Sequence, residues 1–216
     1  GSYRFIRCRV ISTVTNISSQ LTELTFFGQN NESILLDKSL FSIPVMQSDN
    51  PGTFYSADPS NYLYDDDYSW RYSDKYGYHS GQDAVPGHFT LDLGVYTQLS
   101  KVKLYFRPTY DYSGNNPTIV EIWGRNNLSQ AEILPVFSFF GNTVTSAPTS
   151  SESLENADWI KLSTTNINGA YSNFHEFEVE PNELVRYLKI RYVDTVAGKG
   201  CQFLELTFEG NGAIKP

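Results

Sequence analysis

Two neighbouring stretches decide the fold of this chain: Leu-Tyr-Asp-Asp-Asp-Tyr-Ser-Trp at residues 63–70 and Pro-Gly-His-Phe-Thr-Leu-Asp-Leu-Gly at residues 86–94. Three successive aspartates in an aromatic, non-helical loop repel one another, so water or a bound hard cation must offset the repulsion. The Asp-x-Asp-x-Ser spacing is compatible with a cation, because alternate residues point the same way and one backbone carbonyl can join them. Simple solvation of a short acidic run is the other interpretation.

Apolar and polar residues alternate in several separate segments, each bounded by Gly, Pro or Asn. A period of two is typical of strands with one buried face, and hardly any segment has the 3.6-residue period of a helix. The sequence therefore predicts an all-β protein, an antiparallel β-sandwich. The residues predicted to face the core are Phe89, Leu91, Leu93, Val102, Leu104, Phe106, Val120, Ile122, Phe177, Val179, Leu188, Ile190, Tyr192, Leu204, Leu206 and Phe208.

The quoted stretches resemble the discoidin family, also called the coagulation-factor type C domain. In that family an acidic strand entry precedes a strand of the type Phe-Thr-Ile-Asp-Leu-Gly. The resemblance covers about residues 45–210 and implies a discoidin-like jelly roll, a galactose-binding-like β-sandwich. Further segments match the family in the same order, at residues 99–104, 120–124, 159–162, 186–191 and 203–206.

The resemblance also implies a structural Ca²⁺ ion, held in that family by the acidic loop and a glutamate of the last strand. Asp66 stands where the family usually has glycine, which is favoured where φ must be positive. The residues at the ligand positions are Asp65, Asp67, Ser69 and Glu205, with backbone carbonyls from Leu63 and Phe203.

The composition excludes several classes of partner. Of the 216 residues, 40% are hydrophobic and 15% aromatic, which is enough for a core and unlike a disordered chain. The formal net charge is −8, so nucleic acid and anionic membranes, which would be repelled, are poor partners, whereas neutral sugars would not be repelled. No run of 18 apolar residues is present, so this domain is not expected to insert into a membrane. For Cys8 we favour a buried free thiol over a disulfide with Cys201.

The beginning of the chain repeats its end. Arg-Phe-Ile-Arg-Cys-Arg at residues 4–9 aligns with Arg-Tyr-Leu-Lys-Ile-Arg at residues 186–191. The match continues without a gap to residues 20–28, which align with residues 202–210. We interpret residues 1–28 as a terminal strand pair resembling residues 183–210, a remnant of an upstream sister domain in a multidomain chain. Two similar hairpins within one sheet are the alternative. Residues 29–45 are then a connector, and residues 46–212 form the discoidin-like sandwich.

Tyrosines are concentrated in two polar loops, residues 71–79 and 107–116. A tyrosine in such a loop offers a flat apolar face and a polar edge, which match the C–H face and the hydroxyls of a sugar ring. Arg, His and Asn in the same loops can bond hydroxyls. The other interpretation is that these tyrosines cover the outside of the sandwich or the calcium loop. The candidate ligand-binding residues are Arg71, Tyr72, Tyr76, Tyr78, His79, Arg107, Tyr110, Tyr112 and Asn115.

Four further side chains are less informative. Trp159 is expected to pack in the fold, as the resemblance implies, whereas Trp123 is either exposed or buried under a loop. His88 and His175 are expected at the surface or at an edge.

The expected function is non-catalytic binding of glycan by an extracytoplasmic module, at the cell surface or secreted. The resemblance points to domains of surface lipoproteins in glycan-foraging bacteria. No nucleophile elbow, zinc-protease motif, phosphate loop or dinucleotide fingerprint occurs in the sequence. The alternatives are a structural or protein-adhesion module, or an accessory domain of a glycoside hydrolase; a glycosidase carboxylate pair stays open from sequence.

Overall fold

The structure, a computed structural model, describes residues 32–44, 46, 49, 63–68, 78–80, 85–107, 114–133, 154–155, 157–167 and 173–215. This part of the chain is built of antiparallel strands, as the sequence predicts. None of the helical segments in the described ranges could cross a membrane. The elements are β1 (Ser33–Leu35), the 3-10 helix η1 (Lys38–Leu40), β2 (Tyr78–His79), β3 (Gly87–Tyr105), β4 (Pro117–Arg125), the 3-10 helix η4 (Gln130–Glu132), β5 (Ile160–Asn166), β6 (Phe174–Glu178), β7 (Val185–Thr195), β8 (Gln202–Phe203) and β9 (Glu205–Ile214).

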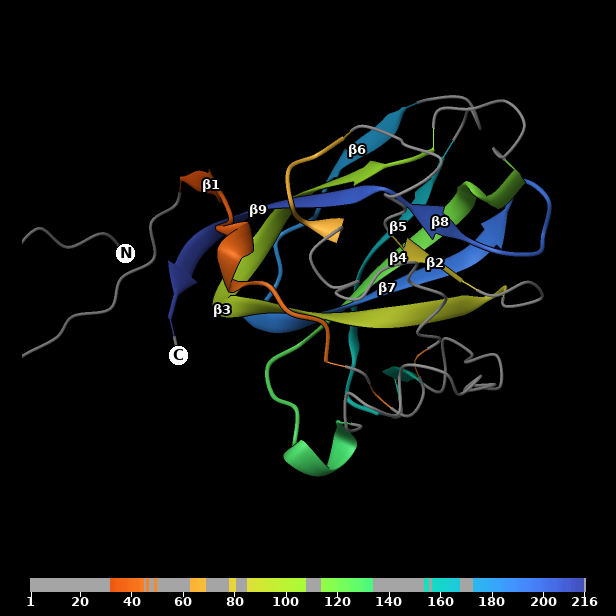
Figure 1. Cartoon of the computed structure of the whole chain (residues 1–216). Coiled ribbons are helices and arrows are strands. Elements are labelled where there is room, and N and C mark those ends of the chain that lie inside the picture. Colours follow the sequence, from red (N-terminus) through yellow and green to blue (C-terminus); the bar gives the residue numbers. More distant parts are fainter. Residues whose placement is uncertain are drawn as a thin grey trace, which may run out of the picture.

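The long strand β3 belongs to both layers of the sandwich (Figure 1). Its first half, from Gly87 to Asp92, pairs with β7, and the strand order continues to β4 and β5. Its second half pairs with β9 and β6, so that Tyr105 lies opposite Glu205. The strand changes direction around Gly94, whose φ is 68°. A Cβ at Gly94 would lie 2.5 Å from the carbonyl oxygen of Leu40, so only glycine fits this bend without displacement.

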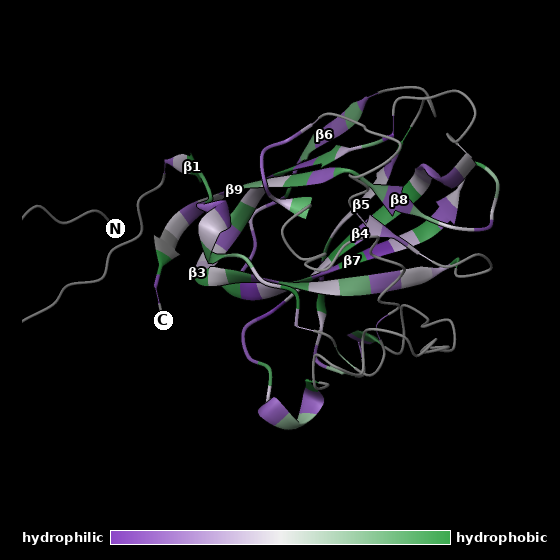
Figure 2. Ribbon diagram, viewed as in Figure 1, coloured by the Kyte–Doolittle hydropathy of each residue, from purple (hydrophilic) through white to green (hydrophobic). Residues whose placement is uncertain are grey.

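The main core lies between the two layers and consists of the alternating residues of the strands. The predicted core residues are buried in this cluster, with two exceptions. Phe177 is only partly buried against the cluster, and Leu204 is buried but does not belong to it. The alternation of hydrophobic and hydrophilic residues along β3, β7 and β9 is visible in Figure 2. Burying one face of each strand removes apolar area from water, which stabilises the sandwich by about 25 cal/mol per Å².

A second apolar cluster covers the outer face of the β7–β4 layer. It contains Met46, Trp123, Leu154 and Trp159. Trp123 is 0% exposed, so of the two interpretations of its position the buried one is correct. Trp159 is buried as well, in the packing role expected for it.

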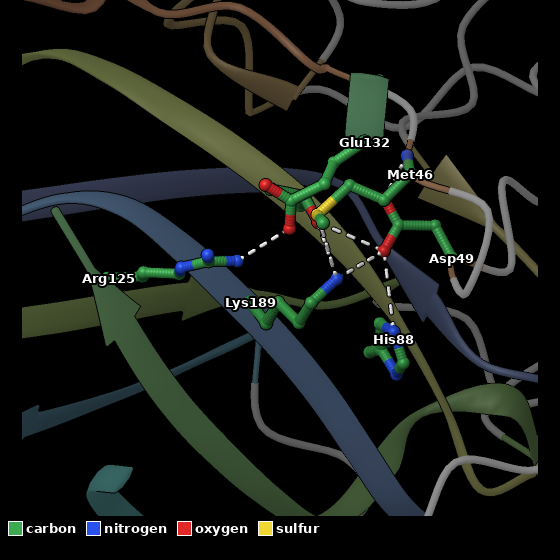
Figure 3. Close-up of polar contacts among 7 residues, drawn as sticks. Met46, Asp49, His88, Arg125, Glu132 and Lys189 are labelled. Carbon is green, nitrogen blue, oxygen red and sulfur yellow. Dashed lines mark hydrogen bonds and ion pairs between the residues drawn. The ribbon is translucent and has the colours of Figure 1, made fainter. Parts of the chain in front are cut away.

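A buried ion pair adjoins this second cluster. The Lys189 ammonium donates to Asp49 Oδ1 at 2.7 Å and to Thr90 Oγ1 at 2.8 Å. In Figure 3 dashed lines join Lys189 and His88 to the same Asp49 carboxylate. His88 is buried, with its Nε2 atom 3.4 Å from Asp49 Oδ1, so the expectation that it lies at the surface or at an edge is wrong. Burial opposes the charge of Asp49, yet Lys189 and His88 together lower its pKa to about 2.

The described part of the segment expected to be a connector is packed into the sandwich. β1 pairs antiparallel with β9, and Leu36 and Phe41 are buried in the main core. The sequence pattern did not predict this strand pairing. Residues 1–28, including Cys8, lie outside the described residues, so the repeat with residues 183–210 stays a prediction. Cys201 is a buried free thiol.

Candidate functional site

The acidic turn and the last strand meet around a lysine. Asp66 and Glu205 are both bonded by the ammonium of Lys38, which lies 2.6 Å from Asp66 Oδ1 and 2.7 Å from Glu205 Oε1. Asp66 has a φ of 62°, which lies in the left-handed region. The related family usually has glycine at this position, so the sequence left open whether aspartate could adopt this conformation. Within the turn, the backbone N–H of Asp67 donates to Asp65 Oδ1 at 2.9 Å. The turn is thus formed without glycine, and a side chain from η1 joins it to β9.

Glu205 is the buried member of this group. It is 0% exposed, and its Oε2 atom is buried and has no hydrogen-bond partner among the described residues. Burial raises the pKa of Glu205 to about 7, although the Lys38 ammonium acts in the opposite direction. Burial also acts against the charge of Lys38, but the bonds to Asp66 and Glu205 outweigh it and raise the lysine pKa. Lys38 is therefore a charged donor at neutral pH.

The described residues do not fit a Ca²⁺ ion at this point while Lys38 is in place. Its ammonium already lies between the two carboxylates, and a divalent cation beside it would be repelled. The side chains of Leu63 and Phe203, the predicted carbonyl donors, are buried in the main core, and Ser69 lies outside the described residues, so it is Lys38 alone that disfavours calcium here. Within the described ranges, no three His, Cys, Asp or Glu side chains are grouped so as to hold a metal. Calcium stays a prediction from the sequence.

Both predicted binding loops contribute to one polar group at the end of the sandwich where β2 pairs with β8. In Figure 1 this end lies on the right, away from the C-terminus. Asn115 Nδ2 lies 3.1 Å from His79 Nε2, and Arg107 Nη1 lies 3.4 Å from Gln202 Oε1. His79 lies opposite Gln202 in the β2–β8 pair. We call His79, Arg107, Asn115 and Gln202 the end cluster.

The end cluster can both donate and accept hydrogen bonds. Burial lowers the pKa of His79, and the positive charge of Arg107 adds to this effect, so the ring is neutral at pH 7. An amide nitrogen can only donate, so His79 Nε2 accepts from Asn115 and the ring proton is on Nδ1. Arg107 is buried, and its carbonyl oxygen accepts from Asn116. These contacts hold the first and last residues of the loop 107–116.

Tyr78 differs from the other candidates of the first loop. It is fully buried, and its hydroxyl lies 2.8 Å from that of Tyr192. Its ring contacts Phe89 and Phe203, so Tyr78 is a core residue and not a surface contact. The sequence groups Tyr78 with the loop 71–79, but in β2 its side chain is buried in the main core. The candidates Arg71, Tyr72, Tyr76, Tyr110 and Tyr112 lie outside the described residues.

An exposed row of aromatic rings, which the sequence did not single out, lies beside the acidic turn. Tyr68 contacts Tyr105 at 4.4 Å between ring centroids, and Tyr105 contacts Phe174 at 5.8 Å. Tyr68 is 46% exposed and Phe174 is 45% exposed. The Lys103 ammonium lies 4.1 Å from the Phe174 ring centroid. We call Tyr68, Tyr105 and Phe174 the aromatic row. The period-two pattern could have predicted that Tyr105 points away from the core. It could not have predicted the contact between Tyr105 and Phe174.

Known families and structures support the fold. The family model DUF5000, described as a domain of unknown function, matches residues 64–210. No curated protein matches the chain. Among solved structures, the SusE-like protein BT2857 has a TM-score of 0.60 at 21% identity, over 81% of this chain and 99% of that chain.

Two further structures are carbohydrate-binding or type C domains. The family 32 carbohydrate-binding module of NanJ from Clostridium perfringens, solved with galactose, has a TM-score of 0.51 at 12% identity, over 82% of this chain and 99% of that chain. An F5/8 type C domain from Bacteroides fragilis has a TM-score of 0.51 at 14% identity, over 84% and 98%. The prediction of a discoidin-like, galactose-binding-like β-sandwich is confirmed.

Proposed function

The chain belongs to the DUF5000 family, a domain of unknown function, and we propose that this member is a carbohydrate-binding module that binds glycan non-covalently. The observation that carries the proposal is the end cluster. His79, Arg107 and Asn115 come from the two tyrosine-rich loops, and they meet Gln202 of β8 at one end of the sandwich. The galactose complex of the family 32 module, a protein of the same fold, adds support.

The chemistry of the end cluster matches sugar hydroxyls. A hydroxyl donates one hydrogen bond and accepts two, so it needs a site with both kinds of partner. Neutral His79 and the amide of Asn115, which are both partly exposed, supply them, and the buried Arg107 guanidinium bonds Gln202 within the same cluster. Tyr72, Tyr76, Tyr110 and Tyr112, in the same loops, are proposed to stack against the sugar ring together with Arg71.

The aromatic row provides a second contact surface for a longer glycan. Its exposed rings form a continuous apolar strip, and the Lys103 ammonium and the carboxylate of Glu176 lie 3.7 Å apart along it. The aromatic rings can stack against the C–H faces of sugar rings, and the charged groups beside them can bond the sugar hydroxyls. A polysaccharide chain presents both kinds of group along its length. Such a surface would add affinity through several weak contacts.

The module is proposed to be non-catalytic and to work outside the cytoplasm as part of a larger protein. Its buried carboxylates Asp49, Glu121 and Glu205 each contact a lysine or arginine, so they serve as ion-pair partners. An accessory domain of a glycoside hydrolase is compatible with the same binding role.

The test is a glycan screen followed by titration calorimetry with the best ligand. We expect His79→Ala and Asn115→Ala each to weaken binding about tenfold, the loss of one or two hydrogen bonds. His175→Ala is the matched control, because His175 is another partly buried histidine with one side-chain hydrogen bond, to Thr165. Unchanged affinity in both end-cluster variants would refute this site, and turnover of the glycan by the wild-type protein would refute the non-catalytic role.

A further inference from the structure

Contacts of the residues on either side of Lys38 position its backbone beside the acidic turn. Asp37 caps η1, because its Oδ1 accepts from the backbone N–H of Ser39 at 3.0 Å. Leu40 lies against Gly94, where no Cβ interferes. Phe41 packs edge-to-face on Tyr64 of the turn, at 5.7 Å between centroids. The position of Lys38 is therefore set by contacts that do not involve its own ammonium group.

The ammonium occupies the point where the turn and the last strand need a positive charge. Lys38 is 8% exposed, and its Nζ contacts Asp66 and Glu205 at once. It also lies 5.6 Å from the ring centroid of Tyr68, the first residue of the aromatic row. A buried carboxylate without a cation is costly, so the pairing of Glu205 stabilises the start of β9.

The residue at position 66 is matched to this lysine. Aspartate at a φ of 62° is strained relative to glycine, and glycine would fit the turn better if only the backbone mattered. Glycine has no carboxylate, however, and could not bond Lys38. Aspartate is thus the residue that both tolerates the left-handed conformation and supplies the second anion.

We propose that the ammonium of Lys38 is the built-in cation of this sandwich, joining the turn at residues 63–68 to β9 in place of a Ca²⁺ ion. The 3-10 helix η1 then supplies the positive charge that a calcium ion from solution would otherwise supply. The stability of the turn, and with it the position of Tyr68, is independent of calcium. This inference does not depend on the proposed glycan binding.

Solvent ions can reach the site, so a calcium titration is a fair test. Asp65 and Asp66 line an open hollow of about 670 Å³ beside Lys38. We expect the melting temperature of the wild-type protein to be the same in chelator and in millimolar calcium. Lys38→Met keeps the apolar stem and removes the charge, and we expect it to melt about 5 °C lower or more.

The matched control is Lys101→Met. Lys101 also bridges two carboxylates, Glu178 at 3.5 Å and Glu209 at 3.6 Å, but it is more exposed, and we expect its loss to shift melting by about 2 °C or less. Two results would overturn the proposal. One is melting of Lys38→Met at the wild-type temperature. The other is stabilisation of the wild-type protein by calcium that Glu205→Gln removes.

A measurement on the wild-type protein keeps the proposal testable if Lys38→Met does not fold. Amine-reactive labelling, followed residue by residue with mass spectrometry, should modify Lys38 at least about tenfold more slowly than the exposed Lys199. Equal labelling of the two lysines would contradict the bridge. Calcium should leave the Lys38 rate unchanged, and a calcium-induced rise to the Lys199 rate would show that the ion displaces the ammonium.

Discussion

Asp49→Asn should destabilise the protein strongly, although it changes one atom of a side chain. Asp49 and Lys189 are both almost fully buried and lie 2.7 Å apart. The amide keeps the shape of the carboxylate but leaves the Lys189 ammonium without a counter-charge. Removing one partner of a buried ion pair typically costs about 3–5 kcal/mol. For a domain of this size that corresponds to a fall in melting temperature of about 6–20 °C.

The structure suggests that part of this loss is recoverable. In the double variant Asp49→Leu/Lys189→Met no charge remains buried beside Thr90 and Trp159. Replacing a buried pair by apolar residues of similar volume is often neutral. We therefore expect the double variant to be more stable than Asp49→Asn, a clear departure from additivity.

Urea-induced unfolding followed by tryptophan fluorescence is the suitable assay, because the Lys189 ammonium lies 4.8 Å from the Trp159 ring centroid. Glu180→Gln, which removes an exposed carboxylate, is the control and should stay within about 0.5 kcal/mol of wild type. The reasoning is refuted if Asp49→Asn unfolds within about 1 kcal/mol of wild type, or if the double variant is the least stable of the set.

Three further predictions follow from the described contacts. The pKa of Asp49 is lowered to about 2 from 3.8, so its contribution to the free energy of unfolding is complete above about pH 4 and is lost as the pH falls toward 2. The stability difference between wild type and Asp49→Asn should therefore shrink over that range, as measured by urea midpoints at a series of acid pH values. Gly94→Ala should lower the unfolding free energy by about 2 kcal/mol or more, because φ is 68° and the new Cβ would meet Leu40, and an unchanged urea midpoint would contradict the bend. Phe174→Ala should reduce retention in glycan affinity gels at an unchanged melting temperature, whereas Ile160→Ala, which removes another exposed apolar side chain, should not; equal retention would remove the aromatic row from the binding surface.

The sequence alone determined the fold class and the faces of the strands. Phe89, Leu91 and Leu93 alternate with polar neighbours, and each residue of a strand points to the side opposite to the next. This information is local, because it depends only on the period of the backbone. The meeting of the acidic turn with Glu205 could also be predicted, because the family resemblance carried a long-range relation that no local pattern contains.

Only the tertiary structure decided which cation stands between them. Lys38 and Glu205 are separated by 167 positions in the chain, and η1 has no pattern that marks its lysine as buried. The same holds for Trp123, whose burial depends on its contacts with Met46, Leu154 and Trp159. A side chain's periodicity fixes the direction in which it points, whereas its charge partner and its exposure depend on what another part of the chain places there.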